Sequence, residues 1–282
     1  MIERHAFRAM GTEIELLVCS SKGSAGDAFG AVEEEFERLE QVMSRFRPDS
    51  ELSQLNRAGA LEVSTDLAHV ILLALAAREQ TAGRFDPCVH DAVVAAGYDR
   101  TFAEIAADGA DTAHVESTCG GRVSVDGNRV ELEDGAKLDL GGIGKGYAAE
   151  RAADILAAAG PCLVDAGGDV VVRGGHAWSV GVETGDGLLT LELERGALAT
   201  SGSDRRRWTR GGEERHHLID PRTGCCAESD VLRVTVFADD AVQAEVLAKL
   251  LFLAGAEEAA ERNETAIVVT RSGETIFTGG FA

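Results

Sequence analysis

The feature that most constrains the fold is a change in the spacing of apolar residues near residue 122. Before that point apolar side chains recur every three or four residues, as at Phe29, Val32 and Phe36, which is the stripe of an amphipathic helix. After it they alternate with polar residues, as in residues 122–133, which is typical of half-buried strands. Because strands and helices do not alternate regularly, the pattern predicts an α+β fold with largely antiparallel sheets flanked by helices.

Local signals place the individual elements. Ser50 or Asp49 is suited to cap the N-terminus of a short helix. Gly83 and Gly255 are suited to end two longer helices. The residues around Gly127 predict the turn of a hairpin. The expected helices cover 29–46, 50–56, 66–83, the segment after the glycines of 141–146, and 239–255, and the expected strands lie in 13–18, 122–133, 162–174, 188–200, 232–238 and 265–279.

Composition excludes several classes of protein. The 282 residues suffice for one large domain or two moderate ones, and any boundary is diffuse because the chain has no Pro-rich linker. A net charge of −21 repels nucleic acid, and residues 204–210 are the one short basic segment. No apolar run approaches the ~18 residues that a membrane helix needs, so we expect no membrane insertion.

The cysteines and the first residues favour the cytoplasm. The six cysteines are scattered, and the adjacent Cys225 and Cys226 cannot easily close a relaxed disulfide with each other. Residues 1–18 lack a basic segment followed by an apolar core, so they do not resemble a secretory signal. No Cys-x-x-Cys or His-Glu-x-x-His motif predicts a zinc site.

Residues 138–156 place a glycine-rich loop directly before a helix. Backbone N–H groups in such a loop, the positive end of the helix dipole and the charge of Lys145 would together suit an anion. A ligand-free turn is an equally open alternative. The loop is not a Walker A motif, because Gly146 follows the lysine, and it is not Gly-x-Gly-x-x-Gly, because Tyr147 stands at the last position.

Other short polar or glycine-rich segments are separated along the chain, and each alone fits an ordinary turn or bulge. They are Met10-Gly11-Thr12, Ser44-Arg45-Phe46, Ser50-Glu51-Leu52, Phe85-Asp86-Pro87, Asp139 to Tyr147, Gly167-Gly168-Asp169, Ser201-Gly202 and His217 to Gly224. In this order, from about residue 10 to about residue 255, they resemble the motifs of the ApbE-type flavin transferases, the FAD:protein FMN transferase family.

The resemblance implies a fold and an activity. The fold is a single ApbE-like domain, residues 1–282, with a flavin cleft between two lobes. The activity is transfer of FMN from FAD to a Thr or Ser hydroxyl of a target flavoprotein through a phosphodiester, with AMP released and Mg2+ assisting. FAD is then the substrate, and the acceptor flavoprotein is the partner. The identity of the acceptor and the oligomeric state stay open.

The resemblance also implies roles for particular residues. His217 is the candidate base for the incoming hydroxyl, since imidazole titrates near neutrality, and Asp220 orients the site or the flavin. Lys145 adds charge at the diphosphate. Met10 and Phe46, which stands where the family usually has tyrosine, pack on the isoalloxazine. The other expected FAD contacts are Phe85, Asp86, Gly141, Gly142, Gly144, Ser201, His217 and Lys249.

The chain departs from the family at the expected magnesium site. The family's helix carries an Asp and, four residues later, a Thr, where this chain has Glu245 and Lys249. Glu245 can bind Mg2+ together with Gly144, whereas a charged lysine has no lone pair for a cation. Lys249 therefore either carries its charge to the diphosphate in partial replacement of the metal or forms a surface ion pair with Glu245.

The sequence leaves open two alternatives to FMN transfer, and it departs from the family at one further residue. The altered helix favours a protein that binds FAD without transferring FMN, and an FAD pyrophosphatase would use water in place of the hydroxyl. Cys88 stands where the family has Thr, which removes a good hydrogen-bond donor. We expect Cys88 to be a buried apolar residue in preference to a reactive thiol.

Overall fold

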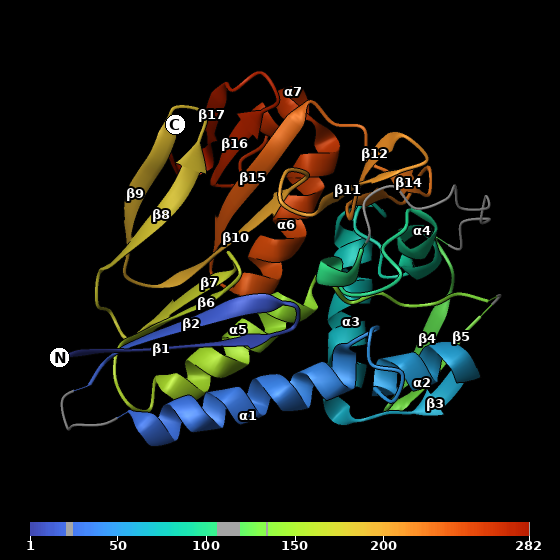
Figure 1. The fold of residues 1–282 in the computed structure, drawn as a ribbon, viewed down its shortest axis with the longest axis horizontal. Helices are drawn as coiled ribbons and strands as arrows, with labels where there is room; N and C mark the ends of the chain where they lie inside the picture. The colour runs from blue at the N-terminus through green and yellow to red at the C-terminus, as the bar shows by residue number, and fades with distance from the viewer. Residues whose placement is uncertain (21–24, 106–118, 134, 282) are drawn as a thin grey trace. The chain divides into compact units, whose positions relative to one another are not determined.

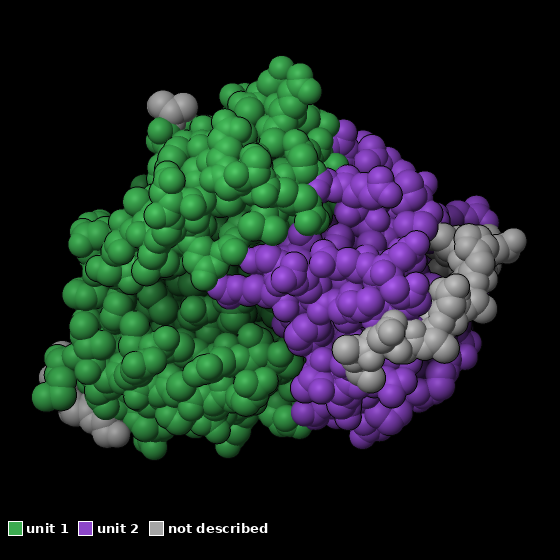
Figure 2. All heavy atoms as spheres, turned by 45° about the horizontal axis from the view of Figure 1, so that its top comes forward, with its two compact units in different colours: residues 1–40, 143–201, 230–282 green, residues 41–142, 202–229 purple. Residues whose placement is uncertain are grey.

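The chain divides into two units, each assembled from separated stretches of sequence (Figure 2). Unit 1 comprises Met1–Glu40, Ile143–Ser201 and Asp230–Ala282, and unit 2 comprises Gln41–Gly142 and Gly202–Ser229. The chain therefore passes from one unit to the other four times, and neither unit is a continuous piece of sequence. The computed structural model describes residues 1–20, 25–105, 119–133 and 135–281.

Unit 1 is built on an eight-stranded sheet, with the strand order β1-β2-β6-β7-β10-β15-β16-β17 (Figure 1). The registers of β1 with β2, β2 with β6, β6 with β7, β7 with β10, and β15 to β17 are antiparallel, which confirms the predicted sheet type. The strands are β1 (Ile2–Ala9), β2 (Thr12–Cys19), β6 (Cys162–Ala166), β7 (Val170–Arg173), β10 (Gly196–Gly202), β15 (Val231–Ala238), β16 (Ala266–Thr270) and β17 (Thr275–Thr278).

Helices cover one face of this sheet. Helix α5 contacts β6 and β7, and α6 contacts β15 and α5. Cys162 of β6 points to α5, because its Sγ donates to the carbonyl oxygen of Ala153 at 3.6 Å. The Asp240 side chain caps α6 by accepting from the N–H of Gln243, and the helix stops before Gly255, as predicted. The helices of unit 1 are α1 (Gly26–Met43), which extends into unit 2, α5 (Gly144–Leu156), α6 (Ala241–Ala254) and α7 (Ala256–Ala260), with a final 3-10 turn η2 (Gly279–Phe281).

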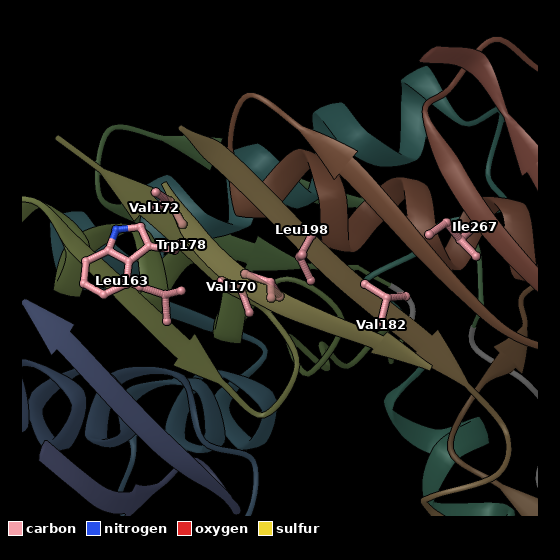
Figure 3. Close-up of a cluster of buried hydrophobic side chains, with 8 residues drawn as sticks. Leu163, Val170, Val172, Trp178, Val182, Leu198 and Ile267 are labelled. Atoms are coloured by element: carbon pink, nitrogen blue, oxygen red, sulfur yellow. The ribbon is translucent and has the colours of Figure 1, made fainter. Parts of the chain in front are cut away.

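The opposite face of the sheet is covered by the hairpin of β8 (Trp178–Thr184) and β9 (Gly187–Leu193). Leu163 follows Cys162 and, since side chains alternate along a strand, points away from α5. It packs in an apolar cluster with Trp178 of β8 and Val170 of β7 (Figure 3). Both faces of the central strands are therefore buried, which explains why β6 and β7 are nearly all apolar.

Unit 2 contains shorter elements. Its helix caps follow the sequence: the Ser50 hydroxyl accepts from the N–H of Ser53, and the Ser64 hydroxyl accepts from the N–H of Leu67. The elements are α2 (Glu51–Ala58), β3 (Ala60–Glu62), α3 (Thr65–Gln80), α4 (His90–Ala95), η1 (Phe102–Glu104), β4 (Val123–Asp126), β5 (Arg129–Leu132), β11 (Arg207–Arg210), β12 (Glu213–His216), β13 (Ile219–Asp220) and β14 (Cys225–Cys226).

The structure adds elements that the sequence analysis did not predict. Strand β1 pairs with β2 along its whole length, and Met10 and Gly11 form the two-residue turn between them, with φ of +50° and +70°. Positive φ at both residues matches the twist of a tight hairpin and explains the glycine. The single strand expected at 188–200 is two strands, β9 and β10, that belong to different sheets.

None of the helices described is both long and apolar enough to span a bilayer. No disulfide joins the six cysteines, all of which lie in the described ranges.

Candidate functional site

The glycine-rich loop of the sequence leads into α5, and one glycine explains how closely α5 packs on α6. A Cβ atom on Gly146 would lie 2.7 Å from the carbonyl oxygen of Ala241, at the start of α6. No real Cβ tolerates that distance to backbone, so only glycine allows this approach. The Gly146 N–H donates to the Glu245 carboxylate at 3.0 Å. This glycine therefore brings α6 side chains to the first turn of α5.

Four charged side chains of unit 1 meet at this point, and we refer to Lys145, Asp169, Glu245 and Lys249 as the lysine–carboxylate cluster. The Lys145 ammonium donates to Asp169 Oδ2 and, at 3.1 Å, to Glu245 Oε1. The Lys249 ammonium donates to the same Glu245 Oε1 at 3.3 Å and to the Glu245 backbone carbonyl at 3.5 Å. Both oxygens of Glu245 are thus engaged, one by two ammonium groups and the other by Gly146.

Burial separates the two kinds of charge in the cluster. The carboxylate side chains of Asp169 and Glu245 are 2% exposed, whereas the side chains of Lys145 and Lys249 are each 17% exposed. The predicted alternative of a surface pair between Glu245 and Lys249 is therefore wrong in one respect: the pair forms, but its acid is buried. The members that solvent reaches are the two lysines.

The cluster perturbs the ionisation of its members. Burial raises the pKa of Asp169 to about 6, although Lys145 opposes the shift. Burial also acts against the charged form of Glu245, but Lys145 and Lys249 outweigh it and lower the pKa of Glu245. Burial lowers the pKa of Lys249, and Glu245 opposes that shift. With all four groups ionised, the cluster holds two positive and two negative charges.

The donor set of this cluster does not fit a hard divalent cation. Such a cation prefers several oxygen ligands, whereas the Glu245 carboxylate already accepts from three N–H donors and Lys249 offers no lone pair. Within the described ranges, no group of three or more His, Cys, Asp and Glu side chains is placed to hold a metal ion. The magnesium ligands implied by the resemblance, Glu245 and Gly144, are thus not arranged as a magnesium site.

The other predicted residues of unit 1 lie on its strands and helix. Met10 forms the turn between β1 and β2, where its N–H donates to Glu40 Oε2 at 3.0 Å. Ser201 lies near the end of β10 and is 5% exposed. Gly144 is the first residue of α5 and is buried. Among the predicted residues of unit 1, the structure brings Lys145, Glu245 and Lys249 into direct contact.

In unit 2 a buried ion pair links the glycine loop to an aromatic side chain. Arg45 Nε lies 2.7 Å from Asp139 Oδ2, and both side chains are less than a tenth exposed. The other Asp139 oxygen accepts from the N–H of Gly141 at 2.7 Å, and Gly142 follows at the end of this segment. The Arg45 guanidinium lies 4.1 Å from the centre of the Phe46 ring. Phe46 keeps 37% exposure, so a polar framework holds a partly open aromatic ring.

The Phe46 ring belongs to a row of aromatic side chains. Its centre lies 5.5 Å from that of Tyr98, which in turn lies 5.5 Å from Trp208. The Trp208 indole N–H donates to the carbonyl oxygen of Ala96 at 2.8 Å. Tyr98 and Trp208 are buried with Ile219 in a small core of unit 2. These contacts hold the Trp208 end of the aromatic row in place, and the partly exposed Phe46 ring forms its other end.

Phe85 and Asp86 are buried and shape a loop. The Asp86 carboxylate accepts from the N–H groups of Cys88, at 2.9 Å, and Gly120, at 2.5 Å. Arg78 lies 3.8 Å from the same carboxylate. These contacts make Asp86 a positioning residue of its loop. Cys88 is fully buried and burial raises its pKa to about 12, which agrees with an unreactive thiol.

The two adjacent histidines of unit 2 occupy different environments. His216 is 5% exposed; its Nε2 lies 3.1 Å from the Ala227 carbonyl oxygen, and its Nδ1 accepts from the N–H of Leu218. These contacts require the proton on Nε2 and hold the backbone on both sides of His217. His217 itself is half-buried and lies between β12 and β13. His216 therefore has a structural role, whereas His217 is partly accessible to solvent.

Asp220 organises the turn that follows β13. Its carboxylate accepts from Arg222 Nε at 3.0 and 3.2 Å, from an Arg222 terminal nitrogen at 2.7 Å and from the Arg222 backbone N–H at 2.9 Å. Hydrogen bonding to Arg222 lowers the pKa of Asp220, so the group is ionised at neutral pH. In the described contacts Asp220 stabilises the Asp-Pro turn, which is the plain alternative to a role toward the flavin.

Three residues of these clusters were not among the site residues predicted from the sequence. Asp169 belongs to the Gly167-Gly168-Asp169 motif, Arg45 is the central residue of Ser44-Arg45-Phe46, and Asp139 begins the glycine-rich segment, but none was assigned to the site. A buried aspartate beside a lysine that is 24 residues away has no local sequence signal. An acid inside a glycine loop, such as Asp139, is the one signal that could have been used, because its side chain can accept from the loop's own N–H groups.

Comparison with known proteins gives a consistent result. The ApbE family model matches residues 10–269. An FAD:protein FMN transferase of Treponema pallidum is 32% identical over 271 residues, covering 84% of this chain and 75% of that protein. The crystal structure of the ApbE protein of Thermotoga maritima superposes with a TM-score of 0.88 at 27% identity, covering 100% of this chain and 98% of the other. The flavin transferase ApbE of Vibrio cholerae shares the fold, with a TM-score of 0.83 at 22% identity and coverage of 100% and 98%.

Proposed function

Because this chain belongs to the ApbE family, we propose that it is an FAD:protein FMN transferase. The observation that carries the proposal is the family match over residues 10–269, which includes the segments of both units that hold the predicted site residues. The similarity to a Treponema pallidum protein of that name supports it. FAD is then the substrate, and a flavoprotein with an accepting Thr or Ser hydroxyl is the partner.

The reaction exchanges one phosphorus–oxygen bond for another. The acceptor hydroxyl oxygen attacks the phosphorus on the FMN side of the diphosphate and forms a phosphodiester. The bond from that phosphorus to the bridging oxygen breaks, and AMP leaves with the electron pair. The hydroxyl proton passes to a base, for which we propose the imidazole of His217, because its unperturbed pKa lies near neutrality. Its half-buried position beside the firmly held His216 supports this role.

The charges of the chain fit a diphosphate substrate. Phosphoryl transfer depends mainly on positioning and on cations that meet the developing negative charge. Lys145 and Lys249 are the solvent-reached members of their cluster, and we propose that they supply this charge. For the isoalloxazine we propose Phe46, whose ring is 37% exposed and flanked by the Arg45 guanidinium. The remaining predicted contacts, including Met10, Phe85 and Ser201, stay predictions.

One assay distinguishes transfer from the alternatives. The protein is incubated with FAD and Mg2+, with and without a candidate acceptor flavoprotein, and both AMP and protein-bound flavin fluorescence are followed. AMP together with a labelled acceptor is the expected result. AMP with free FMN would instead show a pyrophosphatase, and FAD retained without AMP would show a binding protein. Mg2+ is included because the resemblance implies its assistance.

Magnesium dependence and cellular location stay predictions. Repeating the assay after chelation tests the first. The cytoplasmic location rests on the sequence arguments alone, and fractionation of cells followed by detection of the protein tests it. The acceptor can be sought as the protein that becomes flavin-labelled in an extract of the same cells.

A further inference from the structure

We propose that Lys145 and Lys249 give this chain a metal-independent phosphate site, in which the two ammonium groups take the place of the divalent cation that the ApbE resemblance implies. The inference rests on the proposed function, since the phosphate groups are those of FAD. It begins from the disagreement between the implied magnesium site and the side chains that the structure places there.

The carboxylates of the cluster are already occupied by protein donors. Glu245 Oε1 accepts from Lys145 at 3.1 Å and from Lys249 at 3.3 Å, and Oε2 accepts from the N–H of Gly146 at 3.0 Å. Asp169 Oδ2 accepts from Lys145. A cation that bound Glu245 Oε1 or Asp169 Oδ2 would have to displace an ammonium group from that oxygen. That ammonium would then lie next to a divalent charge, which is strongly unfavourable in a partly buried site.

Lys249 determines the net charge of the lysine–carboxylate cluster. Without it, one lysine would face the two carboxylates of Asp169 and Glu245, and the cluster would carry a net charge of −1, which attracts a metal ion and repels a phosphate. With it, the formal charges cancel. Two of the four lysines of the chain are used at this one place. Lys249 therefore removes the net negative charge that would attract a cation and repel a phosphate.

The arrangement in space favours an anion more strongly than the neutral total suggests. The two lysine side chains are 17% exposed, and the carboxylate side chains of Asp169 and Glu245 are 2% exposed, so a ligand arriving from solvent meets the lysine side chains before the carboxylates. An ammonium has three N–H donors. Both hydrogen bonds of Lys249 within the described residues go to Glu245, which leaves one donor for a phosphate oxygen.

The wild-type protein provides the first test. After exhaustive chelation, FAD binding is measured by equilibrium dialysis in EDTA and again in millimolar Mg2+. We expect retention of FAD in EDTA, with a dissociation constant that Mg2+ changes by no more than about twofold, because the fixed ammonium groups already supply the charge. This arm needs no variant, so it does not depend on whether a substitution folds.

Variants at position 249 provide the second test, with folding checked by circular dichroism and thermal melting. Lys249→Met removes the charge, and we expect FAD binding in EDTA to weaken by about tenfold or more. Lys249→Thr also restores an oxygen ligand, so its binding should weaken in EDTA and recover in Mg2+. The same variant should gain a Mn2+ equivalent by electron paramagnetic resonance relative to wild type. Lys137→Thr is the matched control, because Lys137 also pairs with a carboxylate, Asp91, but lies outside the cluster.

The outcomes separate this inference from the proposed function. If wild type retains FAD only when Mg2+ is present, or if Lys249→Met binds FAD in EDTA as wild type does, the metal-replacement proposal is wrong and the transferase proposal stands. If wild type retains no FAD in either buffer, the proposed function itself is wrong.

Discussion

At the scale of single residues, burial and partners separate structural charges from those that can serve a ligand. Asp220 and Asp86 are each engaged by groups of their own loops, so their first effect is on local structure. The lysines at 145 and 249 instead cover buried carboxylates and keep access to solvent. Residue type alone does not distinguish these cases, because all four residues stand in motifs of the same family resemblance.

His217 allows a direct test of the proposed base. Replacement by alanine should lower the rate of FMN transfer by about 100-fold or more, because a positioned general base contributes that much. FAD binding in dialysis should change little, since the loss concerns proton transfer. His69→Ala is the control: this histidine is exposed on α3. Transfer by the His217 variant at the wild-type rate would show that another group removes the proton.

Asp169 predicts a pH dependence of stability. Its pKa of about 6 in the folded state lies above the ordinary value of 3.8, so the folded protein holds the proton more tightly than the unfolded chain. The stabilisation is fully present below the unfolded-state pKa of 3.8 and is lost as the pH rises through about 6. Relative to Asp169→Asn, which cannot titrate, wild type should lose up to about 3 kcal/mol of unfolding free energy between pH 4 and 7.

Urea denaturation of wild type and Asp169→Asn at several pH values measures this difference. The other titratable groups contribute equally to the unfolding free energy of both proteins, so their contributions cancel. The exceptions are Lys145, Glu245 and Lys249, which interact with Asp169. A difference that stays constant from pH 4 to 7 would show that Asp169 titrates normally.

At the scale of elements, the close approach of α5 and α6 depends on Gly146. Gly146→Ala would place a Cβ 2.7 Å from the backbone oxygen of Ala241 and 3.1 Å from Glu245 Oε2, so one helix must move. We expect a loss of about 1–3 kcal/mol in unfolding free energy, which is typical of overpacking. FAD binding should weaken as well, because the cluster spans both helices.

Gly30 is the matched control for that substitution. It lies in α1, is exposed, and has no atom within 4 Å of an added Cβ. Gly30→Ala should therefore stabilise the protein by about 0.5–1 kcal/mol through the higher helix propensity of alanine. Equal effects of the two substitutions in thermal or urea denaturation would contradict the packing argument at Gly146.

At the scale of the whole molecule, each unit draws on separated parts of the chain. One hydrophobic cluster of unit 2 joins Ala92, Val93 and Tyr98 from one stretch to Trp208 and Ile219 from another. A fragment of residues 41–142 would lack the second stretch and expose the apolar side of the first. We expect such a fragment to show no cooperative unfolding transition, because its core is incomplete.

Joining 41–142 to 202–229 through a flexible linker of roughly 20 residues restores both halves of that core. This joined fragment should unfold cooperatively in urea. Circular dichroism monitors the unfolding of both fragments, and the fluorescence of Trp208, which the shorter fragment does not contain, monitors that of the joined fragment. A cooperative transition in the shorter fragment would show that residues 41–142 fold without their partner stretch.

Local sequence determined a large part of this protein. Apolar spacing placed α1, α3 and α6, Ser50 marked the start of α2, Gly255 marked the end of α6, and alternation marked the β4–β5 hairpin and the strands of residues 265–279. These features depend on interactions within a few residues, so they are visible in the chain itself. The motifs in order indicated the ApbE family, which the comparisons confirm.

Tertiary structure alone decided how distant residues meet. Nothing local in the sequence pairs Asp169 with Lys145, places Glu245 under two ammonium groups, or couples Arg45 to Asp139. Local patterns also left β1 and the separation of β9 from β10 unpredicted, because strand pairing depends on partners far along the chain. The electrostatic environment and the burial of the candidate site depend on such long-range contacts, so they are established only when the chain folds.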